Sequence, residues 1–210
     1  MIIKGVVNTG KGTIEGVGTI EGGKYEKIRI KGVCTVVGDI EAESLVIDGV
    51  CTCSGSIEAN ELDCDGVITI EGNLRARTMD IDGVVTVNGN KVEADQIKCD
   101  GVLSVEGEIS ADTIDAEGKI NAKEVVGDYI KVRSYWKSWG IFRPFFKLGE
   151  KTSMKFSSID LIEGTRVELR GVRARSVNGQ DVIIGRNCEI DRVEASGELQ
   201  IHPSARIGGM

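Results

Sequence analysis

The sequence has few of the residues on which many sites and folds depend. Aromatic residues make up only 4 % of the 210 residues, and there are two prolines and one histidine. A single histidine excludes most histidine-rich metal sites. A core with so few rings must be filled by Val, Ile, Leu, Ala and Cys, which favours regular strands. No run of 18 apolar residues is present, so we expect no transmembrane helix.

Charge and cysteine usage narrow the class of protein further. The net charge is −7 and the pI is about 5.0, which argues against nucleic acid as a partner. The first residues lack the apolar run of a secretory signal, and the six cysteines lack the spacing of a disulfide framework. We therefore expect a cytoplasmic protein.

Glycine is the abundant residue, with 28 copies, and it marks an internal repeat. The spacings are 17, 17, 17 and 18 residues in each of two series: Gly32, Gly49, Gly66, Gly83 and Gly101, and Gly38, Gly55, Gly72, Gly89 and Gly107. A regular repeat of this length is typical of a solenoid, in which each unit buries its apolar side against its neighbours.

Within each repeat the apolar residues alternate with a period of two, which indicates strands. In one repeat the residues expected to face inward are Leu45, Ile47, Cys51, Cys53, Ile57 and Ala59; those expected to face outward are Val46, Asp48, Thr52, Ser54, Glu58 and Asn60. The sequence therefore predicts an all-β fold, a right-handed parallel β-helix with three sides and about 17 residues per turn. The left-handed hexapeptide solenoid is the rival, but its strict six-residue pattern is not kept.

The same period returns near the C-terminus. Thr165, Val182 and Leu199 are 17 residues apart, as are Val167, Ile184 and Ile201. Three segments are therefore expected: a main repeat block over residues 1–128, an insertion over residues 129–156, and further turns of the coil over residues 157–210.

The insertion differs chemically from the coil. Residues 129–156 hold eight of the nine aromatics, with seven basic residues and one acid, whereas residues 1–128 hold 12 basic and 24 acidic residues. Rings interleaved with basic residues are typical of a membrane-interface segment. The hypothesis is contact with an anionic membrane or a partner through Trp136, Trp139, Phe142, Phe145 and Phe146, with Lys137, Arg143 and Lys147 at the headgroups. Bracing of the coil, self-assembly and docking to another protein are the alternatives.

The repeat resembles that of the bactofilins, the polymer-forming bacterial cytoskeletal proteins. The stretch VIIGRNCEIDRVEASGELQIHP, which starts at Val182, is similar to the end of a longer bactofilin subgroup of spore-forming bacteria. This resemblance implies a right-handed β-helix that polymerises without nucleotide, often near the membrane, and that has no catalytic site. The aromatic and basic insertion departs from the family pattern.

We therefore expect a structural scaffold that forms a homopolymer through its ends. The alternative is a non-polymerising β-helix that docks a membrane or an envelope protein through residues 129–156. We expect no enzyme activity, cofactor, metal or nucleotide. GVVNTGKG, which places Lys11 as in a P-loop, has Gly12 where a Ser or Thr should bind magnesium.

Two outward columns leave other interpretations open. Aspartates precede the corner glycines at Asp48, Asp65, Asp82 and Asp100, where they either bind cations or stabilise the turns. A second column holds Thr19, Thr35, Thr52, Thr69, Thr86 and Ser104, which is either an ice- or sugar-binding face or a regular solvent face.

Overall fold

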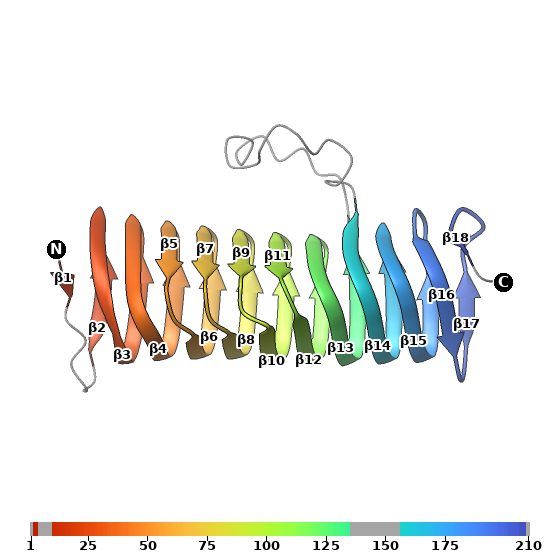
Figure 1. Ribbon diagram of the computed structural model, residues 1–210, viewed down its shortest axis with the longest axis horizontal. Helices are drawn as coiled ribbons and strands as arrows, with labels where there is room; N and C mark the ends of the chain where they lie inside the picture. Colours follow the sequence, from red (N-terminus) through yellow and green to blue (C-terminus); the bar gives the residue numbers. More distant parts are fainter. Residues whose placement is uncertain (1, 4–9, 135–155, 209–210) are drawn as a thin grey trace.

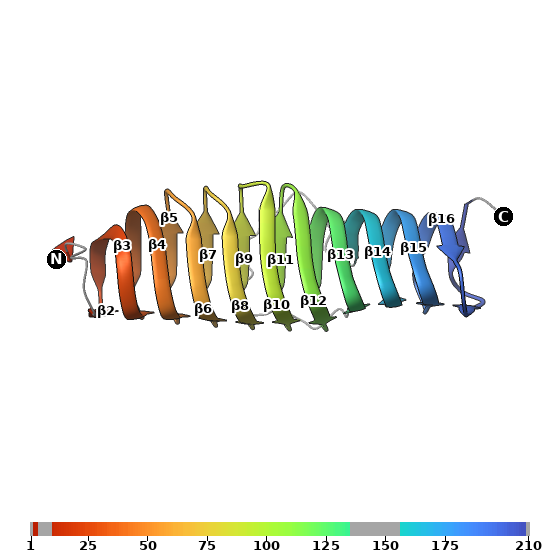
Figure 2. The same ribbon diagram turned by 90° about the horizontal axis from the view of Figure 1, so that it is seen from below.

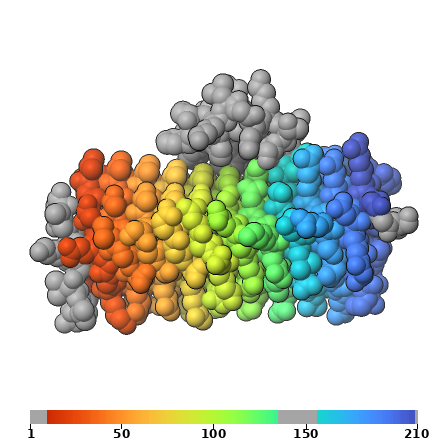
Figure 3. Space-filling model, in the orientation of Figure 1, coloured from red at the N-terminus to blue at the C-terminus, as the bar shows by residue number. Residues whose placement is uncertain are grey.

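The chain forms one continuous parallel β-solenoid of about 10 turns, with 77 % of its residues in strands. The structure is a computed structural model, and it describes residues 2–3, 10–134 and 156–208, with no helix among them. The turns stack along one axis into a rod, with β2 at one end and β17 at the other (Figure 1). The colours follow one another in order along the rod, so each turn lies next to its neighbours in sequence (Figure 3).

The strands follow one another around the coil. They are β1 (Ile2–Ile3), β2 (Lys11–Ile14), β3 (Val17–Ile30), β4 (Val33–Ile47), β5 (Val50–Cys53), β6 (Ile57–Cys64), β7 (Val67–Ile70), β8 (Leu74–Ile81), β9 (Val84–Val87), β10 (Lys91–Cys99), β11 (Val102–Val105), β12 (Glu108–Ala116), β13 (Lys119–Arg133), β14 (Ser157–Arg170), β15 (Val172–Ile184), β16 (Glu189–Ala195), β17 (Leu199–Ile201) and β18 (Arg206–Ile207).

One turn shows how the sequence makes three sides. Strand β5 supplies one side, and β6 supplies the other two because its alternation slips where Asn60 and Glu61 are both exposed. The strands bend there, as the view from below shows (Figure 2). The predicted polar corner therefore lies inside a strand, and the two glycine corners separate the strands.

Neighbouring turns pair in parallel, with equivalent residues stacked on one another. Cys34 pairs with Cys51 and Thr35 with Thr52, and the inward residues form a single core of Ile, Val, Leu, Ala, Cys and one Met and Tyr. At the corner, a Cβ on Gly66 would lie 2.0 Å from the backbone oxygen of Gly49, so only glycine fits this stack. The prediction of a parallel β-helix with about 17 residues per turn is confirmed.

The predicted register near the C-terminus is partly wrong. Val182 pairs with Leu199 as expected, but its other neighbour is Val167 and not Thr165. The turn between β14 and β15 is shorter than 17 residues because two corners each lack a residue. Inward residues flank one such corner at Ile159 and Ile162, three positions apart.

The insertion begins later than predicted. Strand β13 continues through Arg133, and Ile130 and Val132 are fully buried in the coil. Ile130 pairs with Ile114 of β12 and with Val167 of β14. Residues 129–133 belong to the coil because their apolar residues keep the inward alternation. The two repeat blocks therefore form one coil, with no break between β13 and β14.

One outward residue is covered. Val46 lies on the outer face, as predicted, but is only 8 % exposed. Its neighbour in the stack is Arg29, whose guanidinium donates to Asp48 Oδ2 from Nε at 2.9 Å and from Nη2 at 2.7 Å. The Arg29 side chain lies against the outer surface and shields the valine.

Candidate docking and assembly surfaces

The predicted membrane or partner contacts lie outside the residues that the structure describes. They are Trp136, Trp139, Phe142, Phe145, Phe146, Lys137, Arg143 and Lys147, and they all fall within residues 135–155. Their contact with a membrane or partner stays a prediction. The described coil does show where this segment starts and ends.

Both ends of the segment meet at one point on the coil. The hydroxyl oxygens of Ser134 and Ser157 are 2.7 Å apart, and the backbone nitrogen of Ser157 donates to Ser134 Oγ at 3.2 Å. Ser134 Oγ also donates to the backbone oxygen of Gly118 at 3.2 Å, which places this point on the glycine corner. Beside it, the Arg173 guanidinium lies 4.3 Å from the centre of the Phe156 ring.

Five aspartates form an acidic ridge along this corner on the N-terminal side of the junction. The acidic ridge consists of Asp63, Asp65, Asp80, Asp82 and Asp100. Asp80 accepts from Lys98 Nζ at 3.2 Å. In the described part of the chain, no ion pair joins the other four to a basic group.

The ridge carboxylates repel one another. Partial burial raises the pKa of Asp63, and the neighbouring charges of Asp65, Asp80 and Asp48 raise it further. The pKa of Asp82 is raised by burial and then by Asp80, with a smaller opposing effect from Lys98. Both shifts mean that the folded protein disfavours the negative charge at these positions. A cationic group beside the ridge would relieve this repulsion.

A valine strip borders the acidic ridge. The strip consists of outward residues in six successive turns: Val17, Val33, Val50, Val67, Val84 and Val102. Val17 is 80 % exposed, Val33 is 49 % exposed and Val50 is 36 % exposed. Two positions further along each strand lies the predicted column of threonines, with Thr35, Thr52 and Thr69 stacked as expected. This face of the sheet is flat and uncharged.

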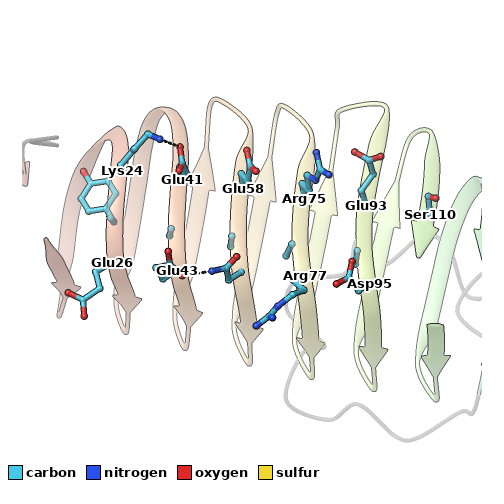
Figure 4. A pocket seen from close by; sticks show the side chains of 16 residues that line it. Lys24, Glu26, Glu41, Glu43, Glu58, Arg75, Arg77, Glu93, Asp95 and Ser110 are labelled. Carbon is cyan, nitrogen blue, oxygen red and sulfur yellow. Dashed lines mark hydrogen bonds and ion pairs between the residues drawn. The ribbon is translucent and has the colours of Figure 1, made fainter. Parts of the chain in front are cut away.

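A shallow groove of about 770 Å³ follows the polar corner across turns from Lys24 to Ser110. Small residues form its floor at Ala42, Ala59, Ala76 and Ala94, and charged residues form its walls (Figure 4). The walls satisfy one another in part, because Lys24 Nζ lies 2.7 Å from Glu41 Oε2 and Asn60 donates to Glu43. The sequence signal for this groove is an alanine at the same place in each repeat.

The C-terminal end of the coil is open. Strands β17 and β18 pair only with the preceding turn, through Val182–Leu199 and Ile190–Ile207. Leu199 occupies an inward position but is 44 % exposed, and Ile201 and Ile207 are only partly buried. No further described strand covers these residues, so the end presents apolar side chains and unpaired backbone groups.

All six cysteines are buried and free, which confirms the predicted inward placement of the five in the main repeat. The thiols of Cys34 and Cys51 are hydrogen-bonded to each other across neighbouring turns, and this contact together with burial raises the pKa of Cys51. Burial raises the pKa of Cys64 and of Cys99 to about 12. These thiols are therefore packing residues with low reactivity.

The other candidate sites gather no further chemistry. Over residues 10–134 and 156–208, no group of three or more His, Cys, Asp or Glu side chains could hold a metal ion. His202 accepts a 3.1 Å hydrogen bond from the backbone of Ser204 in a turn. Lys11, of the P-loop-like stretch, begins strand β2. No helix in the described part is long and apolar enough to cross a membrane.

Comparison with known proteins gives one partial match. The chain is 46 % identical over 48 residues to an uncharacterized protein, YhbE, of Bacillus subtilis strain 168. The match covers 23 % of this chain and 20 % of YhbE, so the chain spans about a fifth of that relative's length. No protein-family model matches the chain, and no solved structure matches it. The comparisons therefore define no family, and the fold class rests on the coil itself.

Proposed function

We propose that this β-solenoid is a structural scaffold that polymerises end to end without nucleotide, as its resemblance to the bactofilins implies. The observation that carries the proposal is the open C-terminal end. There the stacking of strands stops at β17 and β18 with the core exposed at Leu199. A terminal turn without a cap can continue its parallel pairing in the next molecule.

The sides of the coil support stacking along the axis rather than across it. Outward positions of β6, β8 and β10 are rich in charged residues, such as Glu58, Arg75 and Glu93 in one wall of the groove. Charges along a sheet surface disfavour the packing of sheet on sheet. The rod therefore has its apolar, unpaired surface at the end.

Electron microscopy and analytical ultracentrifugation of the purified protein across concentrations test the proposal. We expect filaments or oligomers that grow with concentration and need no added nucleotide. A protein that stays monomeric at the highest concentration would overturn it.

A pair of matched variants locates the interface. Leu199→Asp places a charge at the open end and is expected to give monomers. Val37→Asp places the same charge on the side of the rod, at a valine that is 54 % exposed, and is expected to assemble like the native chain. Equal assembly of both variants would exclude the C-terminal end as the contact.

The alternative function stays a prediction from the sequence. In it, the coil does not polymerise, and residues 129–156 dock an anionic membrane or an envelope protein. The described part of this segment, residues 129–134 and Phe156, belongs to the coil and its junction. The vesicle experiment described in the Discussion separates this alternative from the proposals made here.

A further inference from the structure

We propose that residues 135–155 dock on the outer surface of their own coil, with basic side chains on the acidic ridge and rings on the valine strip. The docking surface consists of described residues on the N-terminal side of the junction. The occupant is this chain's own segment, attached at both ends beside that surface. The proposal goes beyond the scaffold function and does not depend on polymerisation.

The position of the junction brings the segment within reach of the surface. Its ends are held together by the 2.7 Å contact between Ser134 and Ser157, so the segment must leave and return at one point. A doubled chain of this length extends to about 33 Å, at roughly 3.3 Å per residue. Successive turns are about 4.8 Å apart. The segment can therefore reach past the corner at Gly49, four turns from the Gly118 corner.

Charge selects the N-terminal direction. The segment has five basic residues, Lys137, Arg143, Lys147, Lys151 and Lys155, and one acid, Glu150. On its N-terminal side lies the acidic ridge. On its C-terminal side the outer surface carries Arg173 and Arg186, which would repel the segment.

The ridge is also the acidic surface with the most unmatched charge. The groove walls contain pairs such as Lys24 with Glu41, whereas Asp63, Asp65, Asp82 and Asp100 have no ion pair within the described residues. The raised pKa values of Asp63 and Asp82 reflect this crowding. Basic side chains at the ridge would gain more than the same side chains at the groove.

The valine strip supplies the apolar half of the surface. Each ridge aspartate that precedes a corner glycine lies two residues before a strip valine, as Asp65 lies before Val67. Val17, Val33 and Val50 form an exposed apolar strip beside the charges. The segment contains six aromatic residues, which gain most from leaving water. A surface that is acidic on one side and apolar on the other matches a segment of rings and bases.

Tryptophan fluorescence tests the proposal because the chain's only two tryptophans, Trp136 and Trp139, are in the segment. We expect blue-shifted emission and weak acrylamide quenching in the native protein at low salt, at concentrations below assembly. Raising the salt to about 1 M shortens the screening length to about 3 Å and is expected to increase quenching.

Two variants with equal charge changes locate the contact. The ridge variant carries Asp63→Asn, Asp65→Asn, Asp82→Asn and Asp100→Asn, because asparagine keeps the turn-forming side chain. We expect its quenching constant to rise at least twofold. The control variant carries Glu43→Gln, Asp95→Asn, Asp112→Asn and Asp128→Asn along the far wall of the groove, and its quenching is expected to match the native protein.

The apolar half has its own matched pair. Val33→Thr with Val50→Thr removes two strip valines and is expected to increase quenching. Val37→Thr, an exposed valine outside the strip, is expected to leave quenching unchanged. Circular dichroism confirms that each variant keeps the coil.

Three results would overturn the proposal. The native tryptophans could be quenched as readily at low salt as free tryptophan amide. The ridge variant could behave like the native protein. The tryptophans could become shielded only when vesicles of equal phosphatidylglycerol and phosphatidylcholine are added, which would assign the segment to a membrane. The salt titration uses the unmodified chain, so the proposal stays testable even if a variant misfolds.

Discussion

The hydroxyl oxygen of Ser157 accepts a hydrogen bond from the backbone nitrogen of Ile120 at 2.9 Å, across 37 positions of the sequence. Ser157 is fully buried and is the one buried polar side chain within the described ranges. Its hydroxyl also contacts Ser134, so a single side chain joins β13 to β14 where residues 135–155 leave the coil. This bond replaces the backbone pairing that the coil has at its other corners.

Ser157→Ala should therefore destabilise the coil. The change leaves the Ile120 backbone nitrogen buried without its acceptor, which costs about 1–3 kcal/mol in the free energy of unfolding. Urea denaturation followed by circular dichroism measures the loss. Ser158→Ala, at the next and exposed position, should change the stability by less than about 0.5 kcal/mol. Equal effects would show that the bond contributes nothing.

The glycine corner predicts a second stability effect. Gly66→Ala would place a Cβ 2.0 Å from the backbone oxygen of Gly49, and neither backbone can move without breaking the stack. We expect a loss of about 3 kcal/mol or more. Gly12→Ala, whose Cβ would meet nothing within 4 Å, serves as the control and should leave the urea midpoint nearly unchanged.

The buried thiols predict how stability depends on pH. The pKa of Cys99 is raised by burial from 9.0 to about 12. The folded state therefore holds this proton more tightly than the unfolded chain does. The contribution is fully present below pH 9 and is lost as the pH rises toward 12. Cys99→Val should weaken the decline in the free energy of unfolding over that range, and an unchanged slope would contradict the assignment.

Thiol reagents should react with the cysteines only when the coil opens. At pH 8 the native protein is expected to show almost no labelling, because all six thiols are buried and those with raised pKa values stay protonated. Ser54→Cys adds a thiol at an exposed position and should be labelled within minutes, which controls for the reagent. Rapid labelling of the native chain would mean that the coil opens readily.

Vesicle sedimentation decides between the two roles of residues 135–155. If the segment docks on its own coil, the native protein should stay in the supernatant with anionic vesicles at physiological salt. If the segment binds lipid instead, the protein should sediment, and Trp136→Ala with Trp139→Ala should abolish sedimentation. Neutral phosphatidylcholine vesicles are the control for non-specific adsorption.

Most of the coil could be predicted from the sequence because its repeat is nearly regular. The alternation of residues such as Cys51 and Cys53 with Thr52 fixes which side chains enter the core, and the structure places them there. The spacing of 17 fails between β14 and β15, where Val167 pairs with Val182. A comparison of positions 17 apart cannot detect turns that lose a residue at two corners.

Other features depend on contacts between turns rather than on the repeat. Val46 is shielded by a neighbouring arginine that pairs with Asp48, and the pattern of one turn does not show this. The role of Ser157 was missed because a lone serine at the end of an insertion has no sequence signal. The groove had one, the alanine repeated at Ala59 and Ala76, but a small inward residue indicates core packing first.

Corners in this coil tolerate changes of length that its sides do not. The turn that ends at Gly101 has an extra residue at the corner near Asn90, and the strands on both sides keep their pairing. The junction at Ser134 and Ser157 carries residues 135–155 in the same way. The solenoid is therefore a molecular ruler with attachment points about 4.8 Å apart. A guest peptide grafted between Glu117 and Gly118 would be displayed at a known distance from one placed between Asp65 and Gly66.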